Sequence, residues 1–222
     1  MSTPARQATA IAARDLRREL RAGEVLLVTI PFGAIALLVV PLAVGIDAPL
    51  LRRIGPGMYW VVVLLFGILV PLRRSAAEDG PQRDLVAMLG VDPAARFAGT
   101  AAAGTMLLAG FAALLAPVAI ALYDPVLTGW PWLLALLPLV AAGLGLIGTL
   151  ASGIAANQRA GGALVPLLVV PLSLPILLAA TQTQEGLRLR EDILPWILLL
   201  IAVDLLLAVA GVLTARVLQE TR

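Results

Sequence analysis

Long uncharged apolar runs alternate with short charged stretches along the chain, and six of these runs are long enough to cross a membrane. A membrane-spanning helix needs about 20 consecutive apolar residues. We expect the spans at residues 25–46, 54–72, 97–123, 130–156, 161–182 and 193–215. The pattern therefore predicts an all-α fold, a polytopic bundle of six transmembrane helices that forms a single domain over residues 1–222.

Arginine is the only basic residue in the chain, and its distribution predicts the orientation of the spans. If there are six spans, twelve of the sixteen arginines lie on the side that holds both termini: Arg6, Arg14, Arg17, Arg18, Arg21, Arg73, Arg74, Arg83, Arg96, Arg159, Arg216 and Arg222. The other side holds Arg52, Arg53, Arg188 and Arg190. Loops rich in basic residues stay in the cytoplasm. We therefore expect both termini to be cytoplasmic.

The segment before the first expected span, residues 1–24, has the pattern of a basic amphipathic helix. Leu16 and Leu20 lie four residues apart with Ala13 on the same face, and arginines alternate with Asp15 and Glu19. A helix of this kind lies in the plane of the lipid headgroups. The alternative is a solvated helix that only supplies charge to orient the first span.

The longest polar stretch, residues 73–96, contains a second amphipathic segment. Leu85, Met88 and Leu89 are spaced to share one face of a helix that Pro81 can open. Asp92 is a candidate N-cap for the helix that follows. An apolar face of this kind is stable when it meets the membrane or a partner protein. The alternative is an ordinary surface loop.

Small residues repeat every fourth position in the fourth expected span, at Ala141, Gly145, Thr149 and Gly153. Small residues at this spacing let helix backbones approach closely within a membrane. The pattern favours helix packing, and the lining of a translocation pathway is the alternative.

Asp204 is the one acidic residue in the middle of an expected span. A carboxylate at that depth is costly in free energy, so it should face a protein interior, a cavity or a partner. The sequence leaves a functional and a structural role equally open. Tyr59 and Trp60, near the start of the second span, are expected to anchor that span at the membrane interface.

The chain contains no Lys, His or Cys, which excludes several chemistries. A phosphate-binding P-loop needs its lysine, and zinc or haem sites usually need His or Cys ligands. The arginines do not form one basic patch, so we expect no nucleic-acid partner. We predict no catalytic residues, no metal site and no cofactor.

Several segments together resemble a known family of membrane proteins. The stretch EDGPQRDLVAMLGVDPAARFAG is similar to the loop helix of membrane subunits of type-2 ATP-binding cassette (ABC) exporters. DLRRELRAGE, GPGMYWVVVLLFGIL, GTLASGIAANQRAGGALVPLLVVPLSLPILLAA and IAVDLLLAVAG more narrowly resemble the haem exporter B family of cytochrome c maturation.

This resemblance implies a non-catalytic permease of the ABC-2 type in the cytoplasmic (inner) membrane. Its partners would be a separate ABC ATPase and other cytochrome c maturation membrane subunits, with two permease copies per complex. Leu85, Met88 and Leu89 would form the coupling helix that docks on the ATPase. The complex would either export haem as cargo or use ATP to release a haem chaperone. A type-2 permease for another small-molecule or lipid cargo, and a non-transporting membrane scaffold, are the alternatives.

Overall fold

The described part of the chain is all-helical, as the apolar pattern predicts. The computed structural model describes residues 3–22, 24–45, 47–67, 92–125, 129–155 and 161–220, and these contain helices and no strand. The helices are α1 (Pro4–Ala22), α2 (Glu24–Val44), α3 (Ala48–Gly67), α6 (Pro93–Tyr123), α7 (Trp130–Ala155), α8 (Gly161–Leu189) and α9 (Leu194–Glu220).

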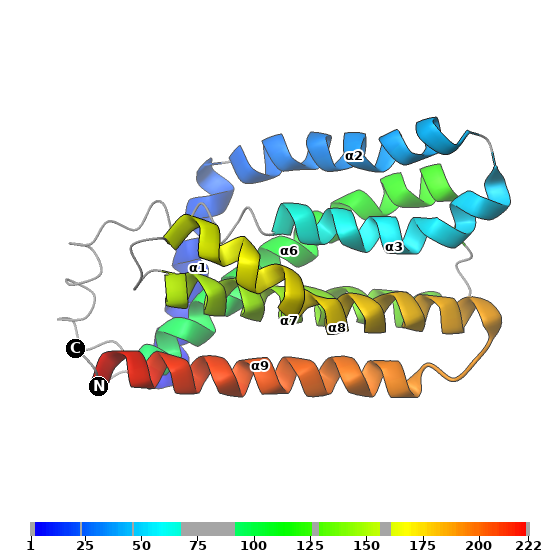
Figure 1. The fold of residues 1–222 in the computed structure, drawn as a ribbon. Helices are drawn as coiled ribbons and strands as arrows, with labels where there is room; N and C mark the ends of the chain where they lie inside the picture. The colour runs from blue at the N-terminus through cyan, green and yellow to red at the C-terminus, as the bar shows by residue number, and fades with distance from the viewer. Residues whose placement is uncertain are drawn as a thin grey trace.

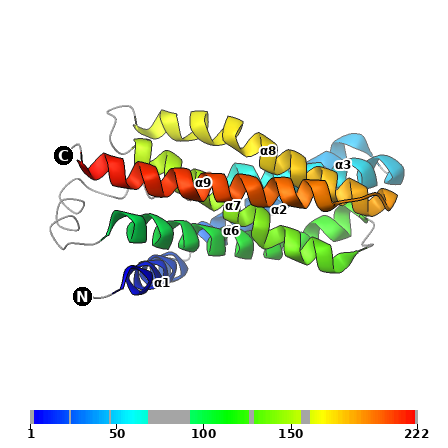
Figure 2. The same ribbon diagram turned by 90° about the horizontal axis from the view of Figure 1, so that it is seen from below.

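Six of these helices run side by side along one direction, and α1 lies across one end of the bundle (Figure 1). The start of α1 and the end of α9 lie at this same end, and Figure 2 shows α1 on the outside of the bundle next to α6. We call this the α1 end, and we call the other the far end. The far end holds the turns between α2 and α3, α6 and α7, and α8 and α9.

Within the described residues, four helices are long and apolar enough to cross a membrane, so the chain is a multi-pass membrane protein. These spans cover Pro93–Tyr123, Trp130–Ile154, Pro166–Leu189 and Leu194–Arg216. The described apolar part of α2, Val28–Val44, is shorter. α3 begins at Ala48, before the expected span, and carries Arg52 and Arg53 in its first turns. Membrane crossing by α2 and α3 therefore stays a prediction.

α6 and α7 form the centre of the bundle. α6 packs against α1, α2, α3, α7 and α9, while α7 also contacts α8 and α9. Fully buried side chains from six helices meet in one apolar core, among them Leu37, Val63, Leu115, Ile147, Ile176 and Leu200. α9 has the smallest buried share of the four spans and lies at the edge of the bundle.

A buried hydrogen bond between α6 and α2 compensates for a proline inside α2. Pro41 has no amide hydrogen, so it cannot donate the helical hydrogen bond to the carbonyl of Leu37 four residues earlier. The Tyr123 hydroxyl donates to this carbonyl at 2.8 Å. Helix prolines are tolerated in membranes where a neighbouring helix supplies the missing donor in this way.

Candidate functional site

At the α1 end, α1 packs closely against the first half of α6. The backbone amide of Asp92 donates to Gln7 Oε1 at 3.2 Å. About two turns further along α6, a Cβ added at Gly99 would lie 2.6 Å from the carbonyl oxygen of Ala8. Only glycine therefore allows the two backbones to approach so closely there. Further along, Leu16 packs against Leu107.

Asp92 is the N-cap of α6, as the sequence predicts. Its side chain accepts a hydrogen bond from the amide of Ala94 at 2.9 Å, and Pro93 occupies the first helical turn. The predicted coupling residues Leu85, Met88 and Leu89 lie in 68–91, outside the described residues. Asp92 is therefore the first described residue after that segment, and its amide is already bonded to α1.

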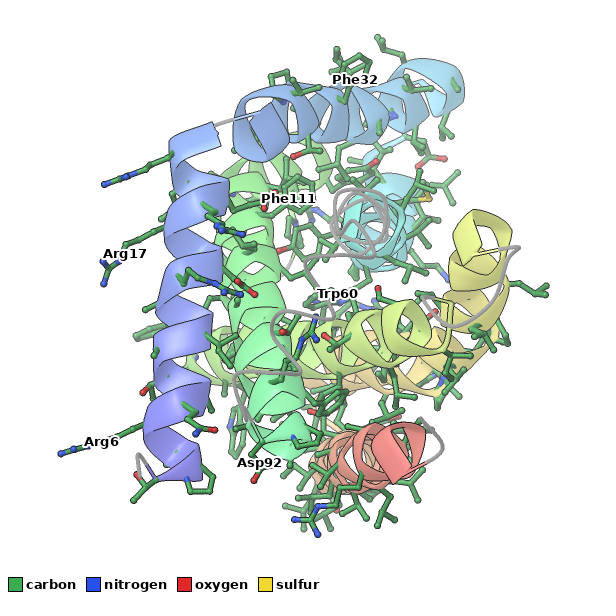
Figure 3. The ribbon with its side chains drawn as sticks, turned by 90° about the vertical axis from the view of Figure 1, so that its left-hand side faces the viewer. Arg6, Arg17, Phe32, Trp60, Asp92 and Phe111 are labelled. Carbon is green, nitrogen blue, oxygen red and sulfur yellow. The ribbon has the colours of Figure 1, made fainter. Side chains whose placement is uncertain are left out.

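α1 carries five exposed arginines. These are Arg6, Arg14, Arg17, Arg18 and Arg21. Figure 3 shows Arg6 and Arg17 pointing away from the bundle. Arg14 pairs with its own neighbour Asp15 at 3.2 Å, and within the described residues the other four form no ion pair.

Asp204 lies in the middle of α9, where α9 meets α7 and α8. A Cβ added at Gly143 of α7 would lie 2.5 Å from Asp204 Oδ1 and 2.5 Å from Ile176 Cδ1 of α8. Asp204 Oδ1 is buried and has no hydrogen-bond partner within the described residues. The carboxylate of Asp204 therefore occupies space that is available because Gly143 has no side chain. Gly143 lies outside the four-residue repeat in α7, so the sequence pattern did not single it out.

The small residues at every fourth position of α7, from Ala141 to Gly153, form a stripe that is packed against other helices at its start and exposed at its end. Ala141 is fully buried, and a Cβ added at Gly145 would lie 2.9 Å from the backbone nitrogen of Thr105 in α6. The Thr149 hydroxyl donates to the Gly145 carbonyl within α7 at 2.8 Å. Among the described residues, no atom lies within 4 Å of a Cβ added at Gly153.

Tyr59 and Trp60 lie inside the bundle, so their prediction as interfacial anchors is wrong. Their exposed fractions are 7% and 2%. The Tyr59 hydroxyl donates to the Ala112 carbonyl of α6 at 2.7 Å, and Trp60 Nε1 donates to Gln184 Oε1 of α8 at 3.0 Å. Figure 3 shows Trp60 in the interior of the bundle. The polar run TQTQE at 181–185 in α8 was the available signal for such a partner.

Ion pairs at the far end connect charges close to the turns. Arg52 at the start of α3 pairs with Asp124, which follows α6, and Arg188 pairs with Glu185 within α8. The described residues hold no group of three or more metal-ligating side chains. Apart from Arg14, the arginines of α1 form no ion pair within the described residues, and they are the largest group of such charges there.

Comparisons with known proteins identify the family of this chain. Residues 6–219 match the family model described as CcmB protein. The chain is 36% identical over 172 residues to "Heme exporter protein B" of Paracoccus denitrificans, covering 76% of this chain and 78% of that protein. It is 33% identical over 176 residues to the protein of the same name in Haemophilus influenzae, covering 78% and 79%. The chain therefore belongs to the CcmB family.

Proposed function

We propose that the chain is the membrane permease subunit of an ABC transporter complex that acts in cytochrome c-type biogenesis. The observation that carries this proposal is the match to the CcmB family over nearly the whole chain, with relatives named heme exporter protein B. The helical bundle with its four apolar spans suits a permease. The complex would export haem or use ATP to release a haem chaperone.

The energy for this process comes from a partner ATPase. The chain has no lysine with which to build a P-loop. The 85–89 segment would form the coupling helix that docks on the ATPase, with Leu85, Met88 and Leu89 as its contact face. Two permease chains and other maturation subunits complete the assembly. A permease for another cargo and a membrane scaffold are the competing functions.

The proposed topology has six spans, with α2 and α3 crossing the membrane beside the four longer helices. The α1 end faces the cytoplasm, because the arginines of α1 gather there and basic loops are retained on that side. α1 would then lie at the cytoplasmic surface of the inner membrane. Trp130 and Trp132, both exposed at the start of α7, would lie at the opposite interface.

Asp204 would serve as the intramembrane polar group of the permease, and the packed part of the α7 stripe would hold α7 against α6. We expect Asp204→Asn, which keeps the side-chain shape, to lower c-type cytochrome output while the protein remains folded. Haem-stained gels and thermal unfolding of the purified variant measure the two effects separately. If the Asp204→Asn variant produced as much c-type cytochrome as the unmodified chain, the carboxylate would have no role in transport.

Co-purification of the ATPase tests the central part of this proposal. A tagged chain, extracted from its own host in mild detergent, should bring down an ABC ATPase that mass spectrometry identifies. Replacing Leu85, Met88 and Leu89 with Asp should abolish this association. Ala87→Asp adds a charge off the predicted face and should retain it. Unchanged association in the triple variant would contradict the coupling role, and absence of any ATPase would contradict the permease function.

A further inference from the structure

Four arginines on α1 share one face of the helix. At about 100° per residue, Arg14, Arg17, Arg18 and Arg21 project within about one third of the helix circumference. All four are exposed, and within the described residues only Arg14 has an ion pair, with the adjacent Asp15. Like charges so close together repel, so an anionic partner would stabilise this face.

This face has a fixed direction because α1 is held on α6 along its length. The contacts are the hydrogen bond between Gln7 and Asp92, the close approach of Ala8 to Gly99, and the packing of Leu16 on Leu107. α6 covers one side of α1, and Arg6 and Arg17 point away from the bundle on the opposite side (Figure 3). Rotation of α1 could not bury the arginines without breaking all three contacts.

The position of this face is next to the membrane. α1 ends at Ala22 and α2, whose apolar part is a predicted span, begins at Glu24. Leu20 is 53% exposed and lies between Arg17 and Arg21 in the sequence. Arginine stems and an exposed leucine on one helix suit the boundary between headgroups and acyl chains better than they suit water.

We propose that Arg14, Arg17, Arg18, Arg21 and Leu20 form a binding surface for the headgroups of anionic phospholipids. Guanidinium groups bind phosphate oxygens through paired hydrogen bonds, and anionic lipids add a net charge that zwitterionic lipids lack. The inference rests on the proposed function for the placement of the α1 end at the cytoplasmic leaflet. The lipid would fix α1, and through the hydrogen bond between Gln7 and Asp92 it would fix the start of α6.

Site-specific fluorescence quenching can measure this lipid preference directly. The chain contains no cysteine, so Ala10→Cys, at an exposed position on α1, takes a single fluorophore. The labelled full-length chain is placed in phosphatidylcholine vesicles. One preparation of these vesicles contains nitroxide-labelled phosphatidylglycerol. A second preparation contains the same amount of nitroxide-labelled phosphatidylcholine instead. The ratio of the two quenching efficiencies reports the enrichment of anionic lipid beside α1.

We expect phosphatidylglycerol to quench several-fold more than phosphatidylcholine, and the ratio to fall toward one as salt is raised. The triple variant R17Q/R18Q/R21Q should lower the ratio to about one. R17K/R18K/R21K keeps the charge and should keep most of the preference. Arg216→Gln removes an exposed arginine of α9 at the same end of the bundle and should leave the ratio unchanged.

Equal quenching by both lipids in the unmodified sequence would overturn the inference, and so would an unchanged ratio in the triple Gln variant. If the triple Gln variant keeps its lipid preference but loses the co-purifying ATPase, the face binds protein, which also overturns it. Loss of the lipid preference in that variant supports the inference whether or not an ATPase co-purifies. Failure of the lipid inference and failure of the permease function are therefore separate results.

Discussion

The Tyr123 hydroxyl provides the donor that Pro41 removes from α2. Its hydrogen bond to the Leu37 carbonyl is 2.8 Å long, and both residues are buried. A buried carbonyl without a donor is costly because no water reaches it. The Tyr59 hydroxyl also donates to a helix carbonyl, that of Ala112. That carbonyl has a helical donor as well, because residue 116 is an alanine.

This difference predicts unequal effects of two identical substitutions. Tyr123→Phe leaves the Leu37 carbonyl unpaired and should lower the free energy of unfolding by about 1–3 kcal/mol. Tyr59→Phe leaves the Ala112 carbonyl with its helical hydrogen bond and should cost about 1 kcal/mol or less. Equilibrium unfolding in mixed micelles measures both. Equal losses would contradict the compensation of Pro41 by Tyr123.

At the scale of helices, glycines set the distance between neighbouring elements of the bundle. Gly145 brings α7 against Thr105 of α6, where both the side chain and the backbone of Thr105 leave no room for a Cβ. Gly153 belongs to the same four-residue repeat but faces open space. The four-residue repeat alone cannot distinguish these two positions, because it does not indicate how far along α7 the contact with α6 extends.

The two glycines therefore form a matched pair. Gly145→Ala places a Cβ 2.7 Å from Thr105 Oγ1, so α6 and α7 must separate. We expect a loss of about 1–3 kcal/mol in the free energy of unfolding. Gly153→Ala should be neutral or should stabilise the helix by up to about 1 kcal/mol. If thermal unfolding gives the same midpoint for both variants, the close contact between α6 and α7 is wrong.

Gly99 performs the same function between α6 and α1. In Gly99→Ala the added Cβ would meet the Ala8 carbonyl oxygen, which is backbone and cannot rotate away. We expect α1 to shift away from α6. Gly110→Ala is the control, because no atom lies within 4 Å of a Cβ at that position of α6.

Disulfide cross-linking measures this shift because the natural sequence has no cysteine. Leu16→Cys and Leu107→Cys, placed at two residues in contact, should cross-link readily. Gly99→Ala should slow the cross-link several-fold, while Gly110→Ala should leave its rate unchanged. An unchanged rate in Gly99→Ala would show that α1 does not depend on this contact.

For the whole molecule, hydropathy predicted the helices well but did not predict which of their faces pack together. Long apolar runs located the helices, and Asp92 was recognised as an N-cap from local chemistry alone. Hydropathy did not indicate the inward direction of Tyr59 and Trp60. In a membrane protein the lipid-facing and core-facing sides are both apolar, so periodicity does not distinguish them. The contact between α1 and α6 joins residues that are distant in sequence, such as Gln7 with Asp92 and Leu16 with Leu107.

The two ends of the bundle differ in their charged residues, and this difference suits a subunit on which a partner ATPase acts at the α1 end. That end carries the arginine face of α1 and the start of α6, and it adjoins the segment proposed to bind the ATPase. In the described residues the far end carries ion pairs instead, between Arg52 and Asp124 and between Arg188 and Glu185. If the 68–91 segment binds the ATPase as proposed, α3 and α6 are the described helices on either side of it in the sequence.

The most direct test of the proposed function is the amount of covalently bound haem in c-type cytochromes of a strain that lacks this chain. Haem staining of membrane and periplasmic proteins should show these cytochromes lost. Expression of the intact chain should restore them, and the Leu85, Met88 and Leu89 to Asp variant should not. Normal c-type cytochrome haem in the deletion strain would contradict a role in cytochrome c-type biogenesis.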